Sequence, residues 1–148
     1  MAIQTSAGTT LSISASLPNS ETATAYGAIT FTPIGEITNV PEYGKSFAEV
    51  TALTLGNRKT RKAKGSYNNG TINVQVLRDT ADAGQAILIA ALESDDNYAF
   101  EVELQDGTIQ YFSGKVMSYT TNVGAPDQYV GASVTIGIDT DIIEVAAP

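Results

Sequence analysis

Apolar and polar residues alternate with a period of two along several stretches of this chain, and no other feature constrains the fold as strongly. The alternation is clearest in residues 71–77 and 129–138. Residues 98–119 hold two such stretches around the turn signal Asp106-Gly107, which predicts a β-hairpin. Two further strands are predicted at residues 9–14 and 29–40, the second with Pro33 at an edge or a bulge.

Residues 79–94 break the alternation and predict a helix. Asp79 or Thr80 is expected to cap it, and Asp82 is expected in its first turn. An apolar stripe recurs at helical spacing in Ile87, Leu88, Ala91 and Leu92. We therefore expect a mainly β fold, with five to seven strands and one helix packed on a face of the sheet.

Three stretches lack a regular pattern. Residues 16–29 are loop-like, and residues 139–148 resemble an extended arm. Residues 41–69 form a long polar connection that holds one possible short strand at 48–55. Connections of this length are usually functional or disordered.

Composition excludes several kinds of chemistry. The chain of 148 residues suits one domain, and it contains no Cys and no His. Disulfides, thiol chemistry and histidine general bases are therefore excluded, and a zinc or copper site is disfavoured. The longest apolar run, residues 86–92, is too short to span a bilayer, and no signal peptide is recognised.

Positive charge is concentrated in one short run. Five of the eight Lys and Arg residues lie within residues 58–64. The rest of the chain combines three cations with all sixteen acids, a net charge of −13. The run has three possible roles: a solvated loop, a nucleic-acid or nuclear-targeting segment, or a surface that docks onto an acidic partner such as another copy. The acidic remainder favours docking, because most of the domain should repel phosphate.

Candidate catalytic and metal-binding patterns are weak. Glu93, Asp95 and Asp96 cluster where the helix should end, but no partner carboxylate is indicated elsewhere. Residues 139–144 loosely resemble a calcium loop but lack its central glycine and ligand spacing. We therefore predict no catalytic residue, no cofactor and no metal site.

Two alternatives to a structural role stay open at this stage. The tyrosines at positions 98, 111, 119 and 129 and the strand-rich pattern are compatible with a β-sandwich binding module of carbohydrate or adhesin type. A small enzyme would have to rely on carboxylates, lysine or tyrosine, and the sequence pairs none of them convincingly.

The outward rows of the predicted strands near 71–77 and 129–137 are polar or small, without the dense charge of an ordinary solvent face. Such rows are typical of a smooth aqueous surface, for example the wall of a channel.

In order and spacing, the chain resembles the major tail tube proteins of long-tailed, non-contractile bacteriophages and their prophage or gene-transfer-particle relatives. The resemblance covers nearly the whole chain and depends on an ordered set of segments. These are "GTTLSI", "FTPIGEITNVPEYG", "KAKGSYNNGTINVQV", "TADAGQAILIAAL", "YAFEVELQDGTIQYFSGKVMSY" and "VGASVTIGI".

This resemblance implies a β-sandwich or barrel-like tail-tube domain over residues 1–148, with one flanking helix. It implies an N-terminal arm at about 1–8, a long stacking loop at about 41–69 and a C-terminal arm at about 139–148. Hexameric rings would join their inner sheets into a continuous barrel and stack into a tube that conducts DNA. The implied partners are further copies, a tape-measure protein, and tail terminator and tail-tip or baseplate proteins, with no membrane. The implied location is the virion tail, assembled in the bacterial host cytoplasm.

The resemblance also suggests roles for individual residues. The basic run lies where the family has its stacking loop and is expected to meet the acidic edge of the next ring. An acidic lumen wall would repel DNA, with Lys115 as a possible inward cation. The expected stacking residues are Arg58, Lys59, Arg61, Lys62 and Lys64, and the lumen candidates are Glu36, Asn73, Gln75, Ser133 and Thr135.

Overall fold

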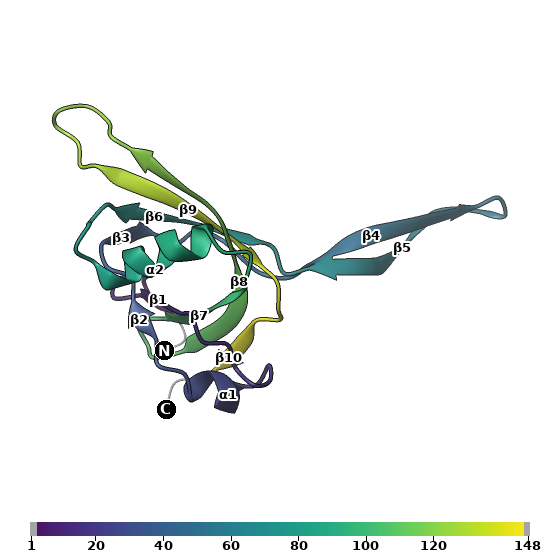
Figure 1. Cartoon of the computed structure of the whole chain (residues 1–148). Helices are drawn as coiled ribbons and strands as arrows, with labels where there is room; N and C mark the ends of the chain where they lie inside the picture. Colours follow the sequence, from purple (N-terminus) through teal and green to yellow (C-terminus); the bar gives the residue numbers. More distant parts are fainter. Residues whose placement is uncertain (1–2, 147–148) are drawn as a thin grey trace.

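The computed structural model describes residues 3–146 and consists of a curled sheet with a long hairpin projecting from it (Figure 1). Eight strands form the sheet in the order β2-β1-β7-β8-β9-β6-β3, with β10 added on β8. The elements are β1 (Thr10–Ser14), α1 (Ala23–Gly27), β2 (Thr32–Pro33), β3 (Ile37–Asn39), β4 (Ser46–Thr54), β5 (Asn57–Asn68), β6 (Thr71–Leu77), α2 (Ala83–Leu92), β7 (Tyr98–Glu103), β8 (Ile109–Asn122), β9 (Gly131–Ile138) and β10 (Ile143–Val145).

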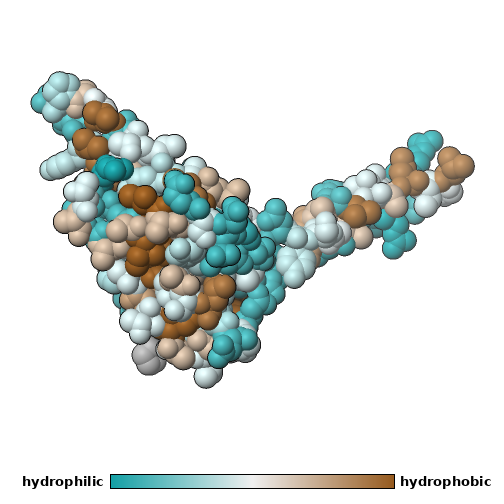
Figure 2. Space-filling view, in the orientation of Figure 1, coloured by the Kyte–Doolittle hydropathy of each residue, from teal (hydrophilic) through white to brown (hydrophobic). Residues whose placement is uncertain are grey.

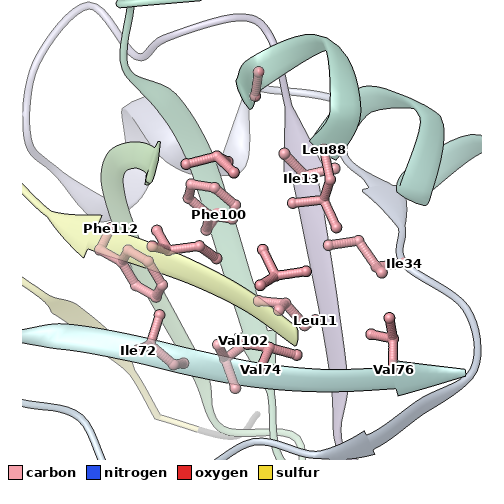
Figure 3. Packing of buried hydrophobic residues seen from close by; sticks show 14 of the residues in the cluster. Leu11, Ile13, Ile34, Ile72, Val74, Val76, Leu88, Phe100, Val102 and Phe112 are labelled. Atoms are coloured by element: carbon pink, nitrogen blue, oxygen red, sulfur yellow. The ribbon is translucent and has the colours of Figure 1, made fainter. Parts of the chain in front are cut away.

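The period-two pattern predicted the buried face of the sheet correctly. Along β6 the side chains of Ile72, Val74 and Val76 are buried, and Val74 lies opposite the buried Val134 of β9. These side chains pack with Phe100 and with residues of β1, β8 and α2 in one core cluster (Figure 3). The strand-rich, barrel-like fold with a flanking helix is therefore confirmed.

The strand predicted over residues 29–40 is in fact two strands on opposite edges of the sheet. The chain leaves β2 at Pro33, which has no backbone donor, and turns at Glu36, whose φ is 61°. It crosses beneath the start of α2, where a Cβ on Gly84 would lie 2.4 Å from the carbonyl oxygen of Pro33. The segment between β2 and β3 thus packs closely against the start of α2 as it connects the two edge strands of the sheet.

Helix α2 begins later than the sequence suggested. Asp82 is the N-cap residue, in place of Asp79 or Thr80, and its carboxylate accepts hydrogen bonds from the backbone N–H of Gln85 at 2.9 Å and of Gly35 at 3.1 Å. One side chain therefore starts the helix and also holds the crossing segment. Leu88 and Ala91 of the predicted stripe are buried against the sheet.

A second, smaller cluster lies on the other face of the sheet and was not predicted. Residues 16–29 contain the short helix α1, and its Tyr26 is fully buried with its ring stacked on Tyr111 at 5.2 Å. The Tyr26 hydroxyl lies 2.7 Å from the hydroxyl of Ser113, so the buried polar atom is paired. Thr22 is the N-cap residue of α1, and its hydroxyl accepts from the backbone N–H of Ala25 at 3.2 Å.

The long connection predicted over residues 41–69 is largely an antiparallel hairpin. The possible strand at 48–55 corresponds to β4, and the basic run lies on β5 and not in a loop. Almost every residue of both strands is exposed, and the hairpin extends away from the body (Figure 1).

The predicted C-terminal arm also contains regular structure, because residues 143–145 form β10 and pair with β8. The expected arms over residues 1–8 and 139–148 each include two terminal residues that lie outside the described part of the chain.

Candidate assembly surfaces

Four of the five predicted lumen residues lie together on the outward side of β6 and β9. Asn73 lies opposite Thr135, and Gln75 lies opposite Ser133. The Ser133 hydroxyl donates to the Gln75 side-chain oxygen at 2.9 Å, so the row is linked by a hydrogen bond. We call this surface, continued onto the second half of β8, the polar face.

The polar face continues onto β8 without adding carboxylates. Ser118 pairs with Thr135, and Thr120 pairs with Ser133, whose carbonyl oxygen accepts from the Thr120 hydroxyl at 3.4 Å. Asn122 pairs with Gly131 at the end of the ladder. The face is therefore polar, and the acidic wall expected from the sequence is not found there.

The fifth candidate, Glu36, lies apart from this row. It is exposed in the turn before β3, and its backbone carbonyl accepts from the N–H of Leu77 at 2.7 Å. Glu36 thus lies at the end of β6, beside the polar face and not in its centre. Sequence reasoning placed it on a strand, whereas the positive φ removes it from the ladder.

Lys115 is the cation that borders the polar face, and its charge is locally balanced. Its ammonium donates to the side-chain oxygen of Asn97 at 2.7 Å and lies 3.4 Å from the carboxylate of Asp139. The Asn97 hydrogen bond, followed by the Lys115 hydrogen bond and charge, holds the pKa of Asp139 below its usual value. Asp139 therefore stays ionised beside the Lys115 ammonium, so the pair adds little net charge.

The two halves of the sheet's outer surface differ in what covers them. Around Ala99 and Tyr111, α1 and the segment after it pack on the sheet, so that half is buried in the second cluster. No element of residues 3–146 covers the polar face in the same way. Its strands also end at two open edges, one along β3 and one along residues 115–122 of β8, where the described residues provide no further pairing.

The predicted stacking residues all lie on β5, but they do not share one face. Lys62 and Lys64 alternate with Arg61, which therefore points to the opposite side of the hairpin. Lys62 is paired with Glu49 at 3.4 Å, and the Lys64 ammonium lies 4.8 Å from the ring centroid of Phe47. Arg58 and Lys59 lie beside the tip, where the register is irregular.

The acidic patterns do not form a metal site within residues 3–146, where no group of three or more acidic side chains is placed to hold an ion. The calcium-like segment is divided among separate contacts. Asp141 pairs with Lys45 at 3.9 Å, Asp139 pairs with Lys115, and Glu144 lies on β10.

Comparison with known proteins assigns the family. The sequence profile described as lambda phage tail tube protein, TTP, matches residues 27–141. The chain belongs to this family. It is a structural tail tube protein of the virion tail.

Solved structures share the fold of this tail tube protein. The tail of an empty GTA particle, refined with C6 symmetry, aligns with a TM-score of 0.70, 13% identity, and coverage of 97% of this chain and 100% of that chain. A PVC sheath/tube terminator of an extracellular contractile injection system gives 0.67 and 11%, with 93% of each chain covered. The SPP1 tail tube gives 0.63 and 12%, with 92% of this chain and 75% of that chain covered.

No curated protein sequence matches the tail tube protein. In the part of the chain that is described, no helix is both long enough and apolar enough to cross a membrane.

Proposed function

We propose that the tail tube protein forms hexameric rings, that the rings stack into a tube, and that the polar face lines the channel. The observation that carries this proposal is an uncovered polar face bounded by two open strand edges. An open edge is a template for another strand. Pairing β3 of one copy with residues 115–122 of β8 in the next copy would satisfy both edges and continue the sheet around the ring.

A channel wall of this composition suits the passage of DNA. Asn73, Gln75, Ser133 and Thr135 offer hydroxyl and amide groups but no cluster of cations to hold phosphates. Lys115 is balanced by Asp139. DNA would therefore move along a hydrated, nearly neutral surface.

The hairpin is proposed to join one ring to the next. It projects from the body and carries five cations, whereas the chain as a whole has a net charge of −8. A contact between the hairpin of one copy and a carboxylate-bearing surface of another is heterologous, and such contacts extend into stacks. The ring-to-ring contact should weaken as salt screens these charges.

Further partners follow from the proposed tube. A tape-measure protein would occupy the lumen before DNA, and terminator and tail-tip or baseplate proteins would close the ends. We assign assembly to the cytoplasm of the bacterial host. We propose no catalytic role, because the chain has neither His nor Cys.

Light scattering and electron microscopy of purified protein test the assembly. We expect particles of six times the 15.5 kDa subunit mass, and rings or tubes in negative stain. Protein that stays monomeric at high concentration, even with tail partners added, would contradict the proposal.

Cysteine labelling tests which surface faces the lumen. Because the chain has no Cys, Asn73→Cys and Thr135→Cys each introduce a single reactive site. A bulky maleimide should label both variants as free subunits and label neither in assembled tubes. Equal labelling of subunits and tubes would show that the polar face lies outside.

A further inference from the structure

The free end of the hairpin carries two leucines that no side chain of residues 3–146 buries. Leu53 is 69% exposed, and Leu55, at the turn, has a relative exposure of 109%. Turn positions favour Gly, Asn, Asp and Ser, so a leucine there gains nothing in an isolated copy. Hydrophobic side chains are visible at this end of the molecule in Figure 2. We call Leu53 and Leu55 the apolar tip.

A groove beside the open edge of β3 offers an apolar surface of suitable size. Its volume is about 210 Å³, and Ser6, Thr9, Thr38 and Asn39 supply its polar lining. The apolar part consists of Ile37, Val40, Tyr43, Val102 and Leu104.

Tyr43 keeps this groove uncharged. Burial, with a smaller contribution from the charge of Glu144, raises the pKa of Tyr43 to about 12, so the hydroxyl is protonated at neutral pH. The hydroxyl donates to the side-chain oxygen of Gln110, so it is already paired. An apolar side chain can therefore enter the groove without leaving this hydroxyl unpaired.

Four other cavities of the described residues suit the tip less well. One lies on the hairpin itself, and a second is lined mainly by polar and acidic side chains. A third includes Lys45, and a fourth is smaller, at about 110 Å³, and includes Arg78. Both cations would repel the basic residues beside the tip.

Charge around the tip and the groove is complementary. Arg58 and Lys59 follow the tip within four residues. Two exposed carboxylates lie close to the groove in sequence, with Glu42 next to Tyr43 and Asp106 two residues after Leu104. Within one copy β4 and β5 pair only with each other and point away from the body, so the groove must belong to another copy (Figure 1).

We propose that the apolar tip of the hairpin inserts into the β3 groove of a copy in the adjacent ring. This inference rests on the proposed stacking of rings and names the surface that receives the hairpin. The nine residues of β4 span about 30 Å, enough to reach beyond the subunit's own body. Tip and groove are different surfaces of identical chains, so each copy offers one contact upward and one downward.

Engineered disulfides test this pairing directly. Leu55→Cys places a thiol on the tip, and Asn39→Cys places one at the groove on an exposed side chain. Oxidised tubes of the double variant should give a ladder of covalent multimers on a non-reducing denaturing gel, whereas either single variant should stop at dimers. The matched control combines Leu55→Cys with Tyr129→Cys, which places the second thiol on an exposed residue that does not line the groove. A ladder from the control pair and none from the groove pair would overturn the proposal.

A second pair of variants compares the loss of a leucine at the tip with the loss of an exposed leucine outside the hairpin. Leu55→Ser should raise the protein concentration needed for tubes by about tenfold while rings still form. Leu17→Ser removes a leucine that is 48% exposed outside the hairpin, and it should leave tube formation unchanged. If Leu55→Ser forms tubes as readily as the parent, the tip assignment is wrong. If the unmodified protein forms no rings, the proposed function is wrong as well. Ring formation by the unmodified protein therefore distinguishes a failure of the tip–groove contact from a failure of the proposed function.

Discussion

The curled sheet and the β4–β5 hairpin use the same alternating strand pattern, yet only the sheet has something to bury. Phe112 in the sheet is 0% exposed, whereas Phe47 in the hairpin is 43% exposed. Helix α2 and the curl of the sheet enclose one side of the body. No other element of residues 3–146 lies over the hairpin. The body therefore supplies subunit stability, and the hairpin is free to supply assembly contacts.

The largest expected effect separates two phenylalanines. Phe112→Ala should lower the free energy of unfolding by about 3–5 kcal/mol, because it leaves a cavity in the main core. Phe47→Ala should cost less than about 1 kcal/mol, since its ring is 43% exposed and packs on Tyr67 and Lys64 within the hairpin. Urea unfolding of dilute, unassembled subunits measures both. Equal losses would show that the hairpin is part of the folded core.

Adding a single methyl group at one of two glycines, one in the sheet and one in the hairpin, compares the same two regions. A Cβ on Gly114 would lie 2.3 Å from the carbonyl oxygen of Gly137, so Gly114→Ala should cost about 1–3 kcal/mol. Gly56 at the hairpin tip has no atom within 4 Å of that position, and Gly56→Ala should change stability by less than about 0.5 kcal/mol. Thermal unfolding of the two variants checks the difference, and a costly Gly56→Ala would contradict an open tip.

Two glutamates should respond to substitution with opposite signs. Burial, followed by the charge of Glu103, raises the pKa of Glu101, so its ionised form disfavours the folded state at neutral pH. Glu101→Gln should therefore stabilise the subunit by about 0.5 kcal/mol, after allowance for partial exposure. Glu49→Gln removes the exposed contact with Lys62 and should cost up to about 0.5 kcal/mol.

The pH dependence checks the sign for Glu101. A raised pKa in the folded state means that folded protein binds the proton more tightly, so this contribution to stability falls as pH rises through that pKa. The advantage of Glu101→Gln should vanish in acid, once the carboxyl is protonated in the parent. Urea unfolding across acidic and neutral pH measures it, and a constant difference at all pH values would rule out the titration of Glu101 as the cause.

A small effect per residue on folding should accompany a large effect on assembly. Replacing the five cations of β5 by Ser should change the free energy of unfolding by less than about 0.5 kcal/mol per residue, because all five are exposed. The same variant should stack poorly, and its residual assembly should tolerate salt better. Electron microscopy at two salt concentrations tests this. Tubes as abundant as those of the parent would refute docking by charge. The substituted residues are Arg58, Lys59, Arg61, Lys62 and Lys64.

Much of the polar face was predictable from the sequence. Alternation placed Asn73 and Gln75 on one side of a strand, and it placed Ser133 and Thr135 on one side of another. The pairing of β6 with β9 then brought these four residues side by side. Their role as a channel wall stays a prediction. Glu36 was misplaced because a turn with positive φ leaves no periodic trace in the sequence.

Local pattern alone determined the main strands, helix α2 and the basic run, because each depends on neighbours within a few positions. Only the tertiary structure decided that residues 29–40 divide between opposite edges of the sheet, and that Tyr26 covers one half of its outer surface. It also decided that Lys115 is balanced by Asp139 and that the basic run lies on a projecting hairpin. These outcomes depend on contacts between residues distant in sequence, and periodicity reports which side of a strand is buried but not what buries it.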